Sequence, residues 1–125
     1  MTIFLRLLFL RIFAWLLAAA VTFATLGPPR YRPQAAAITH DGEHALAFVL
    51  LGLAFAFAYP RQRMLVAGLS VVLVGVLELL QLFVPGRHAR LEDFLVDALT
   101  TLIGMAIAAT IGQFQRSARA RPAPR

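Results

Sequence analysis

Two carboxylates lie inside long apolar segments of this chain. Glu78 follows an apolar run at residues 64–77, and Asp97 lies within a second run at residues 94–111. A carboxylate in a membrane-spanning helix costs a few kcal/mol, so such residues usually face the protein interior and have a function. The chemistry open to them is proton transfer, cation binding, or pairing with an arginine or histidine. We therefore expect Glu78 and Asp97 to be functional.

Further polar residues are predicted to lie at the same level. Gln81 is on the same helical face as Glu78, Asp93 is one turn before Asp97, and His44 stands at the start of another apolar segment. Two arginines fall in the loop between the two acidic segments. We expect these side chains to form one polar binding site, made of His44, Glu78, Gln81, Arg87, Arg90, Asp93 and Asp97.

Several of these residues also have purely structural explanations. Asp41 is a candidate N-cap, and Asp93 would favour a helix start through the helix dipole. The stretch 40–44, His-Asp-Gly-Glu-His, matches the inverted zinc-protease pattern H-x-x-E-H. That chemistry needs both histidines on one helical face and a third ligand, and Gly42 in an expected loop weakens the helix. The pattern is therefore a weak indication of a zinc site.

The elements that must position the site are membrane helices. Apolar residues make up 60% of the 125, and mean hydropathy is +0.76, well above a soluble domain. Four apolar runs lie at residues 12–26 (extended to residue 3 by flanking apolar residues), 45–59, 64–84 and 94–111. Each approaches the ~20 residues of a membrane span. We predict an all-α, four-helix transmembrane bundle at residues 1–112, followed by a basic disordered tail at residues 113–125.

The arginines predict the orientation in the membrane. All 12 basic residues are arginine, and the formal net charge is +6. With four spans, one side holds eight of them (Arg6, Arg11, Arg61, Arg63, Arg116, Arg119, Arg121 and Arg125) and the other four (Arg30, Arg32, Arg87 and Arg90). By the positive-inside rule, both termini are expected in the cytoplasm, with the protein in the cell (inner) membrane. Because the basic residues flank spans instead of forming one surface, we expect no nucleic-acid partner.

Small residues at four-residue spacing predict where the helices pack closely. Gly104, Ala108 and Gly112 continue the helical stripe that carries Asp93 and Asp97. Such stripes let helix backbones approach one another. Gly52 with Ala56, and Gly68 with Gly75, predict similar stripes on the second and third helices. The chain has no cysteine, which excludes disulfides and thiolate metal sites.

These motifs resemble the VanZ-like family, which is named for a teicoplanin-resistance protein. The resemblance rests on Glu78-x-x-Gln81, on Pro85-Gly86-Arg87, and on Asp93 ahead of a glycine-spaced helix. His44, followed by Phe48 and Leu51-Gly52, fits the family's His-x-x-x-aromatic-x-x-Leu-Gly segment. The VanZ-like region covers residues 40–112. Asp97 stands where the family often has asparagine. The resemblance implies a small multi-pass protein of the cell envelope and does not supply a reaction.

Three functions fit these observations. The first is binding of a polar or anionic group of a lipid or lipid-linked cell-wall precursor by the polar layer, linked to glycopeptide or envelope-stress tolerance. The second is a metal-dependent membrane hydrolase that acts on a lipid or phosphoester. The third is a small proton-coupled transporter, for which four helices would require a homo-oligomer. No nucleophile–base pair is visible, so we favour binding over catalysis.

We also expect no metal and no cofactor. Arg87 and Arg90, with His44 if protonated, would balance the charges of Glu78, Asp93 and Asp97. A site balanced in this way has little need of a divalent cation, which would leave excess positive charge in a low-dielectric setting. The expected partners are therefore membrane lipids and a lipid-linked precursor.

Overall fold

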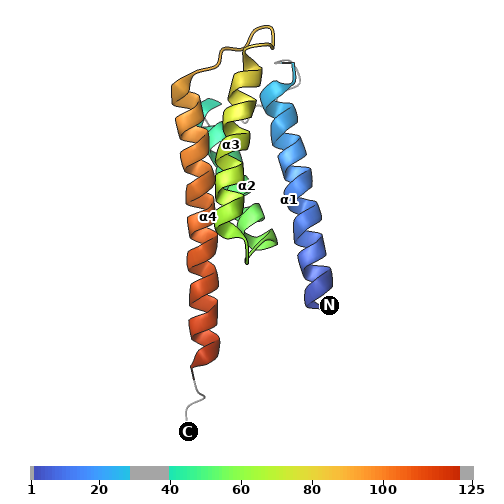
Figure 1. The fold of residues 1–125 in the computed structure, drawn as a ribbon, viewed down its shortest axis with the longest axis vertical. Helices are drawn as coiled ribbons and strands as arrows, with labels where there is room; N and C mark the ends of the chain where they lie inside the picture. Colours follow the sequence, from blue (N-terminus) through green and yellow to red (C-terminus); the bar gives the residue numbers. More distant parts are fainter. Residues whose placement is uncertain (1, 29–39, 122–125) are drawn as a thin grey trace.

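The structure is a computed structural model that describes residues 2–28 and 40–121. These residues form four helices and no strand: α1 (Ile3–Leu26), α2 (His40–Ala58), α3 (Arg63–Gln81) and α4 (Leu91–Ala120). Successive helices run in opposite directions, so the chain enters and leaves at the same end of the bundle (Figure 1). The predicted all-α, four-helix architecture is confirmed.

Three helices, α1, α3 and α4, carry many exposed, large apolar side chains, and α2 exposes Leu46 and Leu50, as expected for a surface covered by lipid. On α1, Phe4 is 73% exposed and Leu16 is 66% exposed, and α3 and α4 expose similar residues along their length. All four helices are long and apolar enough to cross a membrane. In water, so much exposed apolar surface would drive aggregation. The protein is therefore a multi-pass membrane protein; the side on which its termini lie stays a prediction.

The most extensive helix contact joins α2 to α4, and glycines make it possible. A Cβ atom at Gly52 would overlap the carbonyl oxygen of Thr101, and a Cβ at Gly104 would overlap that of Val49. Ala108 and Ala56 are fully buried beside them. The predicted close packing of these two helices is confirmed.

The stripe predicted on α3 is only half right. Gly75 packs against the Phe94 ring, which would lie 3.3 Å from a Cβ at that position. Gly68 has nothing within 4 Å, so it faces open space. Gly112, at the far end of the α4 stripe, borders arginine side chains instead of a neighbouring backbone.

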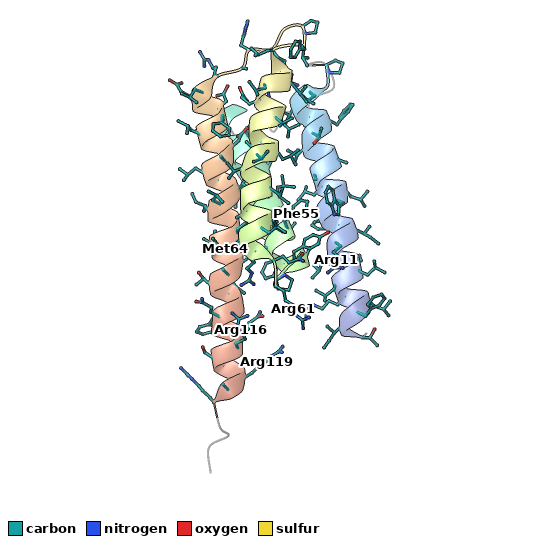
Figure 2. All side chains as sticks on the ribbon, viewed as in Figure 1. Arg11, Phe55, Arg61, Met64, Arg116 and Arg119 are labelled. Carbon is teal, nitrogen blue, oxygen red and sulfur yellow. The ribbon has the colours of Figure 1, made fainter. Side chains whose placement is uncertain are left out.

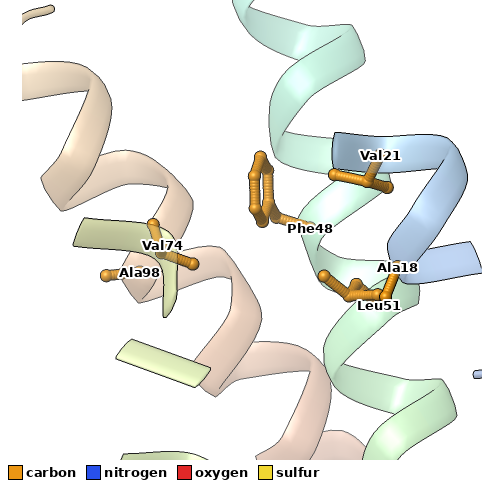
Figure 3. Packing of buried hydrophobic residues seen from close by; sticks show 6 residues of the cluster. All are labelled: Ala18, Val21, Phe48, Leu51, Val74 and Ala98. Carbon is orange, nitrogen blue, oxygen red and sulfur yellow. The ribbon is translucent and has the colours of Figure 1, made fainter. Parts of the chain in front are cut away.

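One apolar cluster holds the four helices together below the polar layer. Its buried members are Ala18 and Val21 from α1, Phe48 and Leu51 from α2, Val74 from α3 and Ala98 from α4 (Figure 3). Phe48 is 1% exposed and is the largest side chain of the cluster. Because all four helices contribute, this cluster fixes their relative positions close to the polar residues.

Three helix boundaries differ from those expected. α4 continues to Ala120, so residues 113–120 of the predicted disordered tail are helical, and residues 122–125 lie outside the described residues. The helix continues because glutamine, alanine and arginine are good helix formers and residues 113–121 contain no proline. α3 ends at Gln81 instead of Val84, ahead of Pro85, and α2 begins at His40.

Candidate functional site

The polar residues of three helices meet at the end of the bundle opposite the termini. They line a cavity of about 380 Å³ between the starts of α2 and α4, the end of α3 and the α3–α4 loop. Six of the seven predicted site residues line it: His44, Gln81, Arg87, Arg90, Asp93 and Asp97. The remaining lining residues are Asp41, Gly86, His88, Glu92 and Val96.

The α3–α4 loop is shaped by the Pro-Gly-Arg sequence. The backbone N–H of Arg87 donates to the carbonyl oxygen of Val84 at 3.2 Å, which closes a four-residue turn with Pro85 and Gly86 in its centre. Gly86 has φ 79°, the value of the third residue of a type II turn, which favours glycine. Pro85 suits the position before it because its φ is fixed. This turn brings Arg87 back over the bundle.

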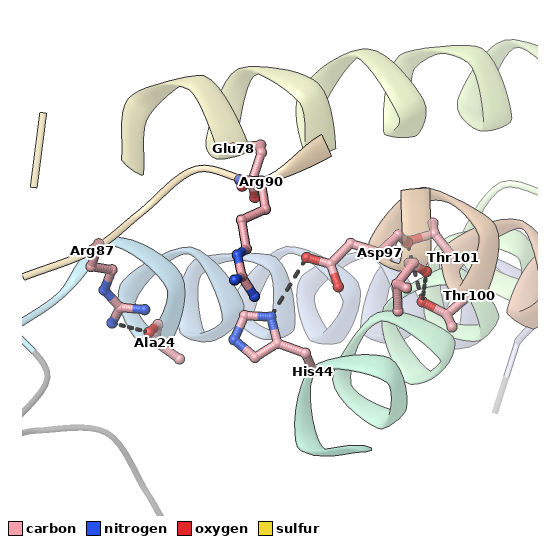
Figure 4. Close-up of polar contacts among 9 residues, drawn as sticks. Ala24, His44, Glu78, Arg87, Arg90, Asp97, Thr100 and Thr101 are labelled. Carbon is pink, nitrogen blue, oxygen red and sulfur yellow. Dashed lines mark hydrogen bonds and ion pairs between the residues drawn. The ribbon is translucent and has the colours of Figure 1, made fainter. Parts of the chain in front are cut away.

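Arg87 fastens the loop to α1. Its Nη2 donates to the carbonyl oxygens of Ala24 and Gly27, at 2.8 Å each (Figure 4). These carbonyls belong to the end of α1, where backbone oxygens lack helical partners, and a cation there also meets the negative end of the helix dipole. Arg87 therefore closes the cavity through a structural contact, and part of its donor capacity is already used.

Glu78 has a different place from the one predicted. It is buried, at 7% exposure, and its Oε1 accepts a hydrogen bond of 2.6 Å from the backbone N–H of Arg90. It does not line the polar cavity; it lies on the neighbouring face of α3, three residues before that helix ends. α3 ends at Gln81, so Glu78 lies within the last turn of the helix instead of six residues before its end. The Glu78 carboxylate therefore holds the loop at Arg90, the residue directly before α4.

Asp97 is the most enclosed acid of the cavity, at 3% exposure. Its Oδ2 lies 3.5 Å from Nδ1 of His44, so the pair links α4 to α2 (Figure 4). The centroid of the His44 ring also lies 6.2 Å from that of the buried Phe48 ring, so one side of the histidine faces the apolar core. The Arg90 side chain points from the loop toward the same histidine (Figure 4). A cation, an imidazole and a buried carboxylate thus meet at one place.

Two acids of the cavity were missed as site residues, and the sequence contained a signal for each. Asp41 lies three residues before His44, so both belong to one face of α2 once the helix is seen to begin at His40. Glu92 directly precedes Asp93 in the first turn of α4. The sequence predicted a loop around Gly42, so Asp41 and His44 were not expected on one helical face. The structure shows that the stretch 40–44 is helical.

The described side chains do not form the set of donors that a metal site needs. Among the residues with described side chains, no three His, Asp or Glu residues are grouped so that they could hold one ion. The side chain of His40, the first histidine of the H-x-x-E-H pattern, lies outside the described residues, so that pattern stays untested.

An apolar groove adjoins the polar cavity on the outer face of α3 and α4. It has a volume of about 570 Å³, and its apolar lining comes from α3 residues such as Val72, Val76 and Leu79 and from Phe94 of α4. Glu78 and Arg90 stand among its lining residues. Arg90 is a lining residue of both the groove and the cavity.

A comparison with protein families agrees with this arrangement. The family model described as VanZ/LLP1 matches residues 11–112, which include most of α1 and α4, all of α2 and α3, and every lining residue of the polar cavity. The chain belongs to the VanZ/LLP1 family. The match extends the resemblance seen in the sequence to α1, whose end Arg87 holds. No curated protein and no solved structure matches the chain.

Proposed function

We propose that this VanZ/LLP1 protein binds an amphipathic lipid or lipid-linked cell-wall precursor, with its polar group in the cavity and its hydrocarbon chain in the adjoining groove. The observation that carries the proposal is that Arg90 lines both the polar cavity and the apolar groove. An amphipathic ligand would place its polar group beside Arg90 and its hydrocarbon chain along the groove. By the orientation that the arginines predict, the cavity faces the outside of the cell.

The charges of the cavity refine the expected head group. Four carboxylates line it, from Asp41, Glu92, Asp93 and Asp97, against two arginines, and Arg87 already donates to α1. The sequence had predicted that acidic and basic charges would cancel in this site, but that count included Glu78 and left out Asp41 and Glu92. With acids in excess, a head group that combines a phosphate with ammonium or hydroxyl donors fits better than a purely anionic one. Arg90 would bind the phosphate, and the carboxylates would accept from the donors.

The test is retention of lipid by the purified protein. The full chain in uncharged detergent would be offered phosphatidylethanolamine, phosphatidylglycerol and a polyprenyl-phosphate-linked sugar, and the bound lipid measured by native mass spectrometry. We expect retention of a lipid that carries donors, and its loss in Arg90→Gln and Asp97→Asn. Gln113→Glu, a similar exchange between amide and carboxylate on α4 outside the cavity, is the matched control.

Glycopeptide susceptibility of cells carrying the same variants tests the link to envelope tolerance. Asp97→Asn and Arg90→Gln should be inserted at normal yield and should abolish any tolerance that the wild type confers. Equal lipid retention by wild type, Arg90→Gln and Asp97→Asn would reject the binding site.

A metal-dependent membrane hydrolase is the second candidate, and the carboxylate excess favours it. A divalent cation would offset that excess, with His44 and Asp97 as the nearest pair of donors. Metal analysis of the purified protein separates the two candidates. One tightly held divalent ion per chain, lost in His44→Ala, would support hydrolysis; a metal-free protein that retains lipid would support binding.

A further inference from the structure

The end of the bundle that carries the termini has arginines and no acidic partner among the described residues. All six Asp and Glu residues of the chain belong to the opposite end: the start of α2, the end of α3 and the start of α4. Arg61 from the α2–α3 turn and Arg116 and Arg119 from α4 lie at this end of the bundle (Figure 2). Positive charge here is therefore not neutralised by side chains of this part of the structure.

Arg116 and a further arginine of this end, Arg63, converge on one small space beside Gly112. A Cβ atom at Gly112 would lie 3.1 Å from Nη2 of Arg63 and 3.7 Å from Nη1 of Arg116, so the two nitrogens are at most 6.8 Å apart. Arg63 is half-buried, and its Nε is shielded from solvent with no hydrogen-bond partner. Like charges repel, so arginines that served only to orient the chain in the membrane would gain by pointing apart.

The start of α3 adds a third source of positive potential. Arg63 is the first residue of that helix, and the residue before it, Gln62, makes no side-chain hydrogen bond to the helix N-terminus. The first backbone N–H groups of a helix lack helical partners and carry the positive end of its dipole. Two guanidinium groups and a helix N-terminus therefore lie close together, and the described residues place no carboxylate between them.

We propose that Arg63 and Arg116, meeting over Gly112, form a binding site for a phosphate group. Guanidinium groups donate two parallel hydrogen bonds to phosphate oxygens at about 2.8 Å, and two arginines can share one phosphate. The absent side chain at Gly112 leaves the space in which the two groups approach. The phosphate belongs either to the head group of an anionic lipid or to a soluble phosphate compound. This site is separate from the polar cavity at the other end of the bundle.

The experiment uses the full chain in uncharged detergent and two probes. Phosphatidylglycerol is compared with phosphatidylcholine by native mass spectrometry, and inorganic phosphate is compared with chloride, at equal ionic strength, by thermal stabilisation. We expect one of the two phosphate probes to bind in preference to its comparison. Arg63→Gln and Arg116→Gln should each weaken that binding about tenfold, as expected for loss of a charge-assisted hydrogen bond.

Arg6→Gln is the matched control, because it removes one positive charge from the same end without touching the pair. Preference for phosphatidylglycerol alone assigns the phosphate to a lipid, whereas stabilisation by inorganic phosphate alone assigns it to a soluble compound. Arg116 is exposed, so its variant should fold even if that of Arg63 does not. Equal weakening by Arg6→Gln and Arg116→Gln, or binding of neither probe, would overturn the proposal.

Discussion

At the scale of single residues, two side chains act on the backbone around the cavity. Arg87 donates to two carbonyls at the end of α1, and Glu78 accepts from the backbone N–H of Arg90. Both were expected to bind a ligand directly. Their contacts instead fix the loop that carries Arg90, so their substitution should change stability as well as binding.

Arg87→Ala should destabilise the protein by about 1–3 kcal/mol, because hydrogen bonds to charged donors contribute about that much and two partly buried carbonyls lose their partner. Thermal unfolding in detergent would measure this loss. Arg121→Ala removes an exposed arginine at the far end and should leave the unfolding temperature unchanged. An Arg87→Ala protein as stable as wild type would show that α1 is held by its apolar contacts alone.

Glu78→Leu and Glu78→Gln should differ in stability. Leucine cannot accept the hydrogen bond from Arg90 and leaves a backbone N–H without a partner, at a cost of about 1–3 kcal/mol. The amide oxygen of glutamine can still accept it, so Glu78→Gln should unfold near the wild-type temperature. The comparison is made by thermal unfolding of both variants in the same detergent. Similar unfolding temperatures for the two would mean that the Arg90 contact contributes little.

At the scale of elements, the sequence predicted the helices well and their ends poorly. Long apolar runs give four helices because a lipid environment leaves few alternatives to hydrogen-bonded spans. The end of α3 depends on a local turn at Pro85 and Gly86, and the start of α2 depends on contacts that hydropathy does not report. Glu78 is therefore three residues from the end of α3, whereas the sequence placed it six residues from that end.

Glycines on α3 and α4 should tolerate substitution very differently. A Cβ at Gly104 would overlap the carbonyl oxygen of Val49, so Gly104→Ala must separate α2 from α4 and should lower the unfolding temperature. Gly68→Ala meets nothing within 4 Å, and alanine favours the helix by about 1 kcal/mol over glycine. It should leave stability unchanged or raise it. Thermal unfolding of both variants, with Leu102→Ile as an exposed control, tests the packing; equal tolerance would contradict it.

At the scale of the whole molecule, charge is divided between the two ends. The acids gather around the cavity, while the termini and the α2–α3 turn carry arginines without acidic partners among the described residues. The sequence predicted six of the cavity's residues because helix direction and depth place them at one level. It could not predict which ones face the cavity, because that depends on helix rotation. The packing of Gly52 and Gly104 sets this rotation for α2 and α4.

The same division of charge predicts the orientation in the membrane. The topology predicted from the sequence assigns eight arginines to the side of the termini and four to the other, so the termini should be cytoplasmic and the cavity should face outward. The chain has no cysteine of its own, so single cysteines can be placed at Gln34, Gln62 and Ser117. An impermeant thiol reagent added to intact cells should label only the cysteine at Gln34, and the other two should react after permeabilisation. Labelling at Gln62 without labelling at Gln34 would reverse the orientation and place the cavity in the cytoplasm, where an outer-leaflet lipid could not reach it.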